Sequence, residues 1–205
     1  MGRLLSLIGA LFFIMTASST EAKDLENQLY IDLKDGRVVI DLRPDLAPQH
    51  VDRIKELARE GFYDGIVFHR VIEGFMAQTG DPTGTGTGGS GEKLRSEFSD
   101  EPFVRGTVGM ARSQNPHSGD SQFFICFDDA QFLNNQYTVW GKVSSGMEFV
   151  DNIERGEPPA NPDKMIKVQV AADVKKNWRL SDDNSCYWWF RFCWSKSGGG
   201  RFTSV

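Results

Sequence analysis

The stretch Phe68-His69-Arg70-Val71-Ile72-Glu73-Gly74-Phe75-Met76-Ala77-Gln78 contains two short strand-forming runs joined by a Glu-Gly turn. Alternation along the first run predicts that Phe68, Arg70 and Ile72 share one face of a strand. This would place a guanidinium among large apolar groups, where arginine is seldom found without a partner or a purpose. One interpretation is an edge-strand arginine that pairs with a carboxylate such as Glu97, and the other is a functional arginine.

The composition is that of one soluble domain with short appendages. The chain has 205 residues, of which 40% are hydrophobic and 25% are charged, which is enough apolar material for a core. The net charge is −5, but residues 23–174 carry −9 and residues 175–205 carry +4. An acidic domain argues against a nucleic-acid partner, because phosphates are bound through basic side chains.

The first 22 residues have the pattern of a secretory signal peptide. Arg3 precedes the 12-residue apolar run Leu4–Met15, and small residues follow as a cleavage site. Such a run is too short to cross a bilayer as a helix. We therefore expect residues 1–22 to be removed and the protein to be exported, with a bacterial periplasm as its location. An uncleaved membrane anchor is the alternative.

The segment 175–205 differs in composition from the rest of the chain. It holds four of the five Trp and two of the three Cys. Its apolar residues follow neither the helical nor the strand spacing. We expect it to be poorly ordered, with a membrane-interface segment as the alternative. Cys186 and Cys193 have no neighbouring His, so a metal site there is poorly supported, and no cofactor is expected.

Between these ends, residues 23–174 alternate short strand patterns with turns. Two helices are expected, one capped by Asp45 and running to about Glu60, the other spanning Glu148–Arg155. Many short strands with two separated helices indicate an antiparallel barrel or sandwich. The strand patterns span residues 28–33, 37–42, 66–72, 75–79, 106–111, 122–127, 138–143 and 167–174.

The usual catalytic patterns are missing. The three His lie apart in the sequence, and Gly-x-Ser-x-Gly is absent, so a hydrolase is weakly supported. His50 is expected to be exposed on its helix, and His69 to be structural. The glycine-rich segment 80–91 lacks the βαβ context of a nucleotide site, so we expect a surface loop near a substrate groove. Cys126 is expected to be a core thiol.

Around Arg70 the chain instead collects apolar and amide side chains, an unusual mixture for a plain core. The stretches Phe68–Asp81, Gly109–Arg112, Ser121–Cys126 and Phe132–Asn134, followed by Trp140–Val143, resemble the cyclophilin-type peptidyl-prolyl cis-trans isomerases in order and spacing. The similarity extends from about Gln28 to Val174. It implies a mainly β fold, an eight-stranded antiparallel closed barrel capped by two α-helices.

The resemblance also implies roles for individual residues. Arg70 corresponds to the catalytic arginine of the family. Other residues correspond by position to the pocket for the proline ring, to two amides that orient the substrate, and to the edge that binds the residue before proline. These substrate-binding residues are Phe75, Met76, Gln78, Ala111, Arg112, Gln122, Phe124, Phe132, Leu133 and Tyr137.

Three positions depart from the common pattern of the family. Many relatives carry Asn at Arg112 and His at Tyr137, and cyclosporin-sensitive members usually carry Trp at Phe132. Because Phe has no indole N–H to donate, we expect cyclosporin binding to be weakened.

The function implied is isomerisation of X-Pro bonds in proline-containing polypeptides, assisting the folding of exported proteins. We expect a monomer without a stable membrane anchor. A proline-peptide binding chaperone without significant turnover is the alternative.

Overall fold

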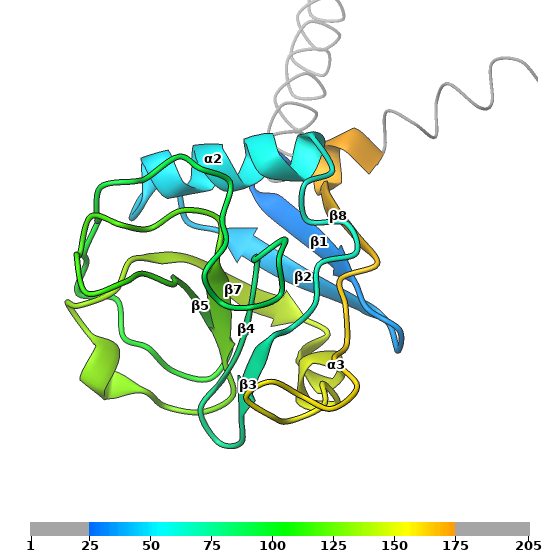
Figure 1. Ribbon diagram of the computed structural model, residues 1–205. Coiled ribbons are helices and arrows are strands. Elements are labelled where there is room, and N and C mark those ends of the chain that lie inside the picture. Colours follow the sequence, from blue (N-terminus) through cyan, green and yellow to red (C-terminus); the bar gives the residue numbers. More distant parts are fainter. Residues whose placement is uncertain (1–24, 175–205) are drawn as a thin grey trace, which may run out of the picture. The chain divides into compact units, whose positions relative to one another are not determined.

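The computed structural model describes residues 25–174, and this part of the chain is mainly β (Figure 1). Eight strands are present where strand patterns were predicted, although most are shorter than the patterns. Their bounds are β1 Gln28–Asp32, β2 Arg37–Leu42, β3 Arg70–Ile72, β4 Met76–Thr79, β5 Thr107–Met110, β6 Phe123–Cys126, β7 Val139–Ser145 and β8 Lys167–Val170. The last predicted strand, 167–174, is wrong in its second half, because residues 171–174 are helical.

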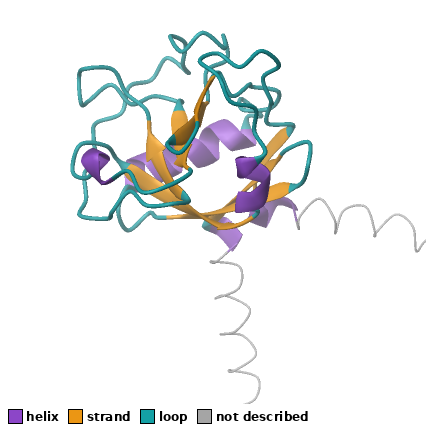
Figure 2. Cartoon of the chain, turned by 90° about the horizontal axis from the view of Figure 1, so that it is seen from below, coloured by secondary structure: helices purple, strands orange, loops and turns teal. Residues whose placement is uncertain are grey.

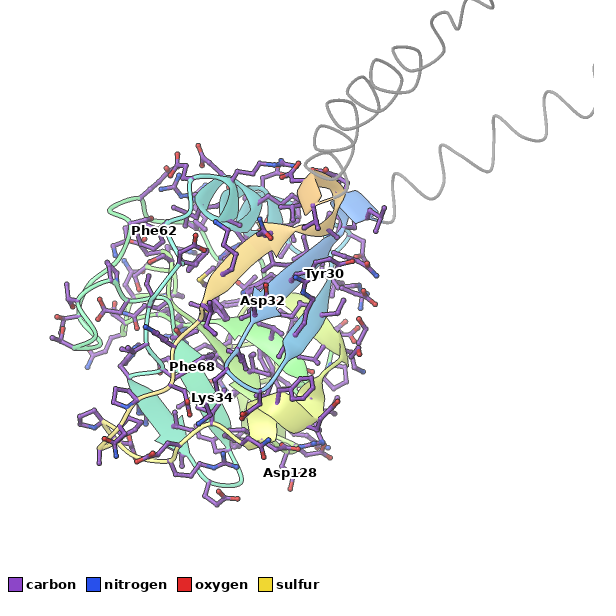
Figure 3. The ribbon with its side chains drawn as sticks, turned by 90° about the vertical axis from the view of Figure 1, so that its right-hand side faces the viewer. Tyr30, Asp32, Lys34, Phe62, Phe68 and Asp128 are labelled. Carbon is purple, nitrogen blue, oxygen red and sulfur yellow. The ribbon has the colours of Figure 1, made fainter. Side chains whose placement is uncertain are left out.

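The strands form one antiparallel, curled sheet in the order β3-β4-β6-β5-β7-β2-β1-β8. Figure 3 shows β8 beside β1, the strand that carries Tyr30 and Asp32. The two edge strands, β3 and β8, are not joined by a continuous ladder. Two isolated antiparallel bridges, Val67 to Lys164 and Val71 to Gly156, lie near that gap instead. The structure is therefore a half-barrel, and the predicted closed barrel goes further than the observed pairing.

The sheet is accompanied by the α-helices α2 (Pro48–Arg59) and α3 (Met147–Asp151) and the 3-10 turn η1 (Gln131–Leu133) (Figure 2). Residues 25–26 and 171–174, at the two ends of the described range, are also helical. Helix α2 packs on β7 and β8 through a buried stripe that includes Val51, Ile54 and Leu57, as its 3.6-residue period predicted.

The residue before helix α2, Ala47, makes no capping hydrogen bond. The distant Glu97 carboxylate caps the first turn instead, accepting the backbone N–H groups of Gln49 and His50 at 3.2 and 3.1 Å.

The predicted cap at Asp45 is wrong, because Arg43 binds its carboxylate at 2.8 Å. That ion pair satisfies Asp45 outside the helix, which starts with proline at its first position.

The interior of the sheet is built from aromatic rings in edge-to-face contact. Phe123 lies 5.7 Å from Tyr63 and 5.3 Å from Trp140, measured between ring centroids. All three residues are fully buried. The Tyr63 hydroxyl donates to the Ser121 carbonyl at 3.1 Å, so its polar atom is satisfied in the core.

Two expectations about single residues are corrected by the structure. Phe68 and His69 are both buried, so regular alternation does not extend back from β3, which begins only at Arg70. His50 is buried rather than exposed, and its Nδ1 lies 2.6 Å from the Glu97 carboxylate. That long-range partner explains how a polar side chain can occupy the inner face of α2.

Cys126 is a buried free thiol, as predicted, and burial raises its pKa to about 12. Within residues 25–174, no helix is long and apolar enough to cross a membrane. The expected signal peptide and the Trp/Cys-rich tail lie outside the described residues.

Candidate functional site

The site is set by strand register. Arg70 on β3 pairs with Gln78 on β4, which pairs with Phe124 on β6, which pairs with Gly109 on β5. Directly paired residues point to the same face of a sheet, so one row carries a guanidinium, an amide and a phenyl ring. Alternation sends Phe123, the residue before Phe124, to the opposite face and into the interior core.

Glycine at position 109 leaves room for the rings of this row. A Cβ there would lie 2.6 Å from ring atoms of both Phe103 and Phe124. These two rings stack with centroids 5.8 Å apart and planes at 23°. Phe124 also meets Tyr137 edge-on at 5.8 Å. The floor of the site is therefore a fixed aromatic surface rather than a mobile one.

Above this floor lies a cavity of about 420 Å³, which we name the apolar pocket. The structure brings together ten of the eleven predicted site residues in its wall. Their side chains range from the buried Met76, Phe124 and Leu133 to Phe132, which is 65% exposed at the rim. The wall consists of Arg70, Phe75, Met76, Gln78, Ala111, Arg112, Phe124, Phe132, Leu133 and Tyr137, with Gln136 in addition.

The eleventh predicted residue, Gln122, does not line the apolar pocket but supports a residue that does. Its side-chain oxygen accepts from Gln78 Nε2 at 2.9 Å, while its own Nε2 donates to the carbonyls of Gly86 and Gly88 at 3.0 and 2.8 Å. The two predicted orienting amides are thus in direct contact. The glycine-rich loop holds Gln122, and Gln122 in turn holds Gln78.

A buried carboxylate fixes that loop from below. Asp81 is 1% exposed and accepts the backbone N–H groups of Thr83, Gly86 and Gly88 at 2.7, 2.6 and 3.1 Å, and the Thr83 hydroxyl at 2.8 Å. These hydrogen bonds lower the pKa of Asp81 to about 2 although burial opposes the charge. The expectation of a surface loop beside a groove describes its place but not this anchoring.

Arg70 is oriented by a partner that the sequence did not indicate. Its Nε donates to Glu157 at 2.7 Å, with 44% of the Arg70 side chain and 52% of the Glu157 side chain exposed. The neighbouring residues Val71 and Gly156 exchange two backbone hydrogen bonds of 2.8 and 2.9 Å. Glu97, the carboxylate considered for this role, binds His50 instead. The terminal Nη groups of Arg70 have no hydrogen-bond partner within residues 25–174.

Arg112 is held differently, by backbone oxygens alone. Its Nε and Nη2 donate to the Gln136 carbonyl at 3.1 and 3.0 Å, and its Nη1 donates to the Ser113 carbonyl at 2.9 Å. The guanidinium lies 4.4 Å above the Tyr137 ring. A positive group over an aromatic face is favourable, so Arg112 and Tyr137 form one unit at the rim.

Two further hollows adjoin the apolar pocket. The first, the Glu157 hollow, has a volume of about 600 Å³ and includes His69, Arg70, Gly86 and Glu157. The second, the loop hollow, has a volume of about 390 Å³ and includes Lys93 and Asp120. Gln78 and Arg112 line all three spaces, so they mark the place where the three meet.

His69 borders the first hollow as a buried, uncharged ring. It is 6% exposed, and neither ring nitrogen has a partner in the described part of the chain. Burial lowers the pKa of His69, opposed by the Asp81 charge and reinforced by the Arg70 charge. No group of three His, Cys, Asp or Glu side chains within residues 25–174 could hold a metal ion.

This arrangement suits recognition of an apolar ring beside a polar backbone. It offers an aromatic floor, fixed amides and a guanidinium. The family model described as "Cyclophilin type peptidyl-prolyl cis-trans isomerase/CLD" matches residues 28–171. The chain belongs to the cyclophilin family. The predicted identity as a peptidyl-prolyl cis-trans isomerase is confirmed at this level.

Curated relatives carry the same description. A "Probable peptidyl-prolyl cis-trans isomerase" of Brucella suis is 57% identical over 179 residues, covering 79% of this chain and 90% of that protein. "Peptidyl-prolyl cis-trans isomerase B" of Bacillus subtilis is 44% identical over 131 residues, covering 62% and 91%.

Solved cyclophilins share the fold. A cyclophilin of Hirschia baltica superposes with a TM-score of 0.67 at 29% identity, covering 72% of this chain and 74% of that one. A cyclophilin-type isomerase of Cryptosporidium parvum, crystallised in the presence of the dipeptide Ala-Pro, gives 0.65 at 28% identity, covering 70% and 98%.

Sequence reasoning missed two residues of this cyclophilin site, Gln136 and Glu157. Gln136 contributes its backbone carbonyl to Arg112, and any residue type could do so. Glu157 lies 87 positions from Arg70, in a loop without a local pattern. No signal in a single sequence points to either residue.

Proposed function

We propose that the apolar pocket holds the proline ring of an X-Pro segment in a polypeptide while Arg70 promotes rotation of the preceding peptide bond. The observation that carries this proposal is the row formed by Arg70, Gln78 and Phe124, which places a donor, an amide and an apolar surface side by side. The Arg70 Nη groups are free to donate to substrate, since Glu157 engages only Nε.

Isomerisation of an X-Pro bond requires positioned groups rather than a nucleophile. Rotation about a peptide C–N bond faces a barrier of about 18–20 kcal/mol, because resonance gives that bond partial double-bond character. In the twisted state the prolyl nitrogen regains its lone pair, and a hydrogen bond to that nitrogen stabilises the twist selectively. A guanidinium held in a partly water-excluded pocket is suited to donate this bond.

The neutral groups around Arg70 have complementary tasks. Gln78, fixed through Gln122, is placed to bind the substrate backbone, and the ring pocket keeps proline still while the preceding carbonyl swings. We also propose that isolated backbone bridges such as Val71 to Gly156 close the barrel between its two edge strands. These bridges would keep β3 and the segment that carries Glu157 at a constant separation.

The test is cis/trans exchange of an X-Pro peptide, measured by exchange NMR with wild-type protein and two arginine variants. Arg70→Ala should lower kcat/KM by about 10² to 10³, because loss of one donor in comparable sites costs about 2.7–4 kcal/mol. Arg37→Ala is the matched control. Arg37 is 42% exposed and its Nε also binds a carboxylate, Asp32, at 2.6 Å, but it lies on β2 away from the site residues.

A loss below tenfold for Arg70→Ala would contradict the role of this residue. A folded wild-type protein that binds the peptide but gives no exchange would favour the alternative, a proline-peptide binding chaperone without turnover.

We further propose that the protein assists folding of exported proteins in a bacterial periplasm, as a monomer without a stable membrane anchor. The signal-like composition of residues 1–22 supports export. Cell fractionation with mass determination of the mature N-terminus tests this. Retention of residues 1–22 in a membrane fraction would favour the anchored alternative.

A further inference from the structure

The site carries positive charge although the domain as a whole is negative. Residues 23–174 carry a net charge of −9, yet the wall of the apolar pocket contains two arginines and no Asp or Glu. In the loop hollow, Lys93 binds Asp120 at 2.9 Å, and in the Glu157 hollow, Arg70 binds Glu157. Arg112 is left as the guanidinium at this junction that makes no ion pair within residues 25–174.

The position of Arg112 is fixed before any ligand arrives. Three hydrogen bonds to backbone carbonyls and the stacking on Tyr137 hold the guanidinium. These partners are neutral, so they orient the positive charge without cancelling it. A pre-ordered donor loses little side-chain freedom on binding, which favours recognition of an anion.

The location of the charge selects the substrate residue that can reach it. If proline occupies the apolar pocket, the X-Pro bond lies near Arg70 and Gln78, at the junction of the three spaces. The side chain of the preceding residue then leaves from that junction, since neighbouring Cα atoms are only about 3.8 Å apart. Arg112 lines all three spaces and is therefore close to that side chain.

We propose that Arg112 makes this isomerase selective for X-Pro segments in which the residue directly before proline is acidic. The inference rests on the proposed function and names its substrate class. A Glu carboxylate is ionised at neutral pH and carries the charge that complements the pocket. The Glu side chain is also long enough to reach the exposed part of the Arg112 guanidinium.

The experiment compares kcat/KM for four peptides that differ only beside proline. They carry Glu-Pro, Gln-Pro, Lys-Pro, and Gln-Pro-Glu, the last with the acid after proline. At low ionic strength the wild-type protein should convert the Glu-Pro peptide about two to five times faster than the Gln-Pro peptide, as expected for a partly exposed ion pair. The ratio should approach one in about 1 M salt, where the screening length is about 3 Å.

Variants assign the effect to one side chain. Arg112→Gln should lower the Glu/Gln ratio to about one, and Arg112→Lys, which keeps the charge, should restore part of it. Using a ratio removes any general effect of these variants on the pocket. Lys142→Gln is the control, because it removes an equal charge from an exposed position of β7 that lines none of the three spaces.

Equal rates for the Glu-Pro and Gln-Pro peptides with active wild-type protein would overturn the proposal. A ratio that survives Arg112→Gln, or an equal gain from Glu placed after proline, would overturn it as well. Absence of turnover for every peptide would contradict the proposed function itself, and this inference with it.

Discussion

Replacing Asp81 by Asn should both destabilise the domain and slow the isomerase, because one buried carboxylate anchors the loop that orients the site amides. One Asp81 oxygen accepts two donors from Thr83, and the other accepts the N–H groups of Gly86 and Gly88. The carbonyls of the same two glycines hold Gln122. The perturbation is therefore transmitted over two hydrogen bonds to the site.

Two arguments give the size of the stability change. The pKa of Asp81 is lowered from 3.8 to about 2, which corresponds to about 2 kcal/mol of stability. A second argument is that Asn keeps one acceptor oxygen, so at least one part-buried N–H loses its partner, at a cost of about 1–3 kcal/mol. We expect Asp81→Asn to lower the free energy of unfolding by about 2–3 kcal/mol at neutral pH.

The same reasoning fixes a pH dependence. A depressed carboxyl pKa contributes stability above the unfolded value of 3.8, and this contribution is lost as pH falls toward about 2. Asp81→Asn lacks the contribution at every pH. The stability difference between wild type and variant should therefore shrink in acid, to roughly half of its neutral value at about pH 3.

The assay is urea unfolding at several pH values, together with exchange rates at neutral pH. We expect kcat/KM of Asp81→Asn to fall about 3- to 10-fold, because small misplacement of orienting groups slows catalysis. Asp64→Asn is the control. Asp64 accepts the Val168 N–H at 3.0 Å and binds Lys167, so its loss should affect β8 but not the rate. A stability change below 1 kcal/mol, or a difference independent of pH, would refute this reasoning.

Two other predictions concern the rim of the site. Glu157→Gln should lower kcat/KM about 2- to 10-fold through looser Arg70 orientation, with little change in urea stability, because a half-exposed ion pair contributes at most about 1 kcal/mol; an unchanged rate would leave Glu157 without a positioning role. Phe132→Trp should tighten cyclosporin binding about tenfold by supplying an indole N–H donor; inhibition titrations in which the wild-type protein is already tightly inhibited would contradict this expectation.

Much of the site was predictable because its residues stand in contiguous stretches that resemble the cyclophilin family. Strand patterns around residues 68–79 and 121–127 predict β3, β4 and β6, whereas the roles of Arg70, Gln78 and Phe124 came from the resemblance. The register that aligns these three residues in one row is seen only in the structure. Period-2 alternation within a strand needs no knowledge of distant partners. The buried stripe of α2 was predictable from its 3.6-residue period, which likewise belongs to a single element.

Several errors and omissions involve partners that lie far apart in the chain, although the wrong cap at Asp45 has a local cause in Arg43. His50 is buried because Glu97, 47 residues away, satisfies it. Glu157 reaches Arg70 across 87 residues. Phe68 broke the predicted alternation because β3 starts only at Arg70, and the residues before it enter the core as irregular backbone. No local pattern encodes these contacts.

The distribution of charge within the site follows from the reaction that it serves. Rotating a peptide bond requires no proton transfer, so the site needs no titrating base, and His69 at its border is kept neutral by burial. The site needs hydrogen-bonding groups whose orientation is fixed. Arg70 is held by a carboxylate from the segment after α3, and Gln78 by Gln122, which the glycine-rich loop holds. Two distant segments thus fix two neighbours in one row, so weakening either support should reduce rate more than binding of the proline ring.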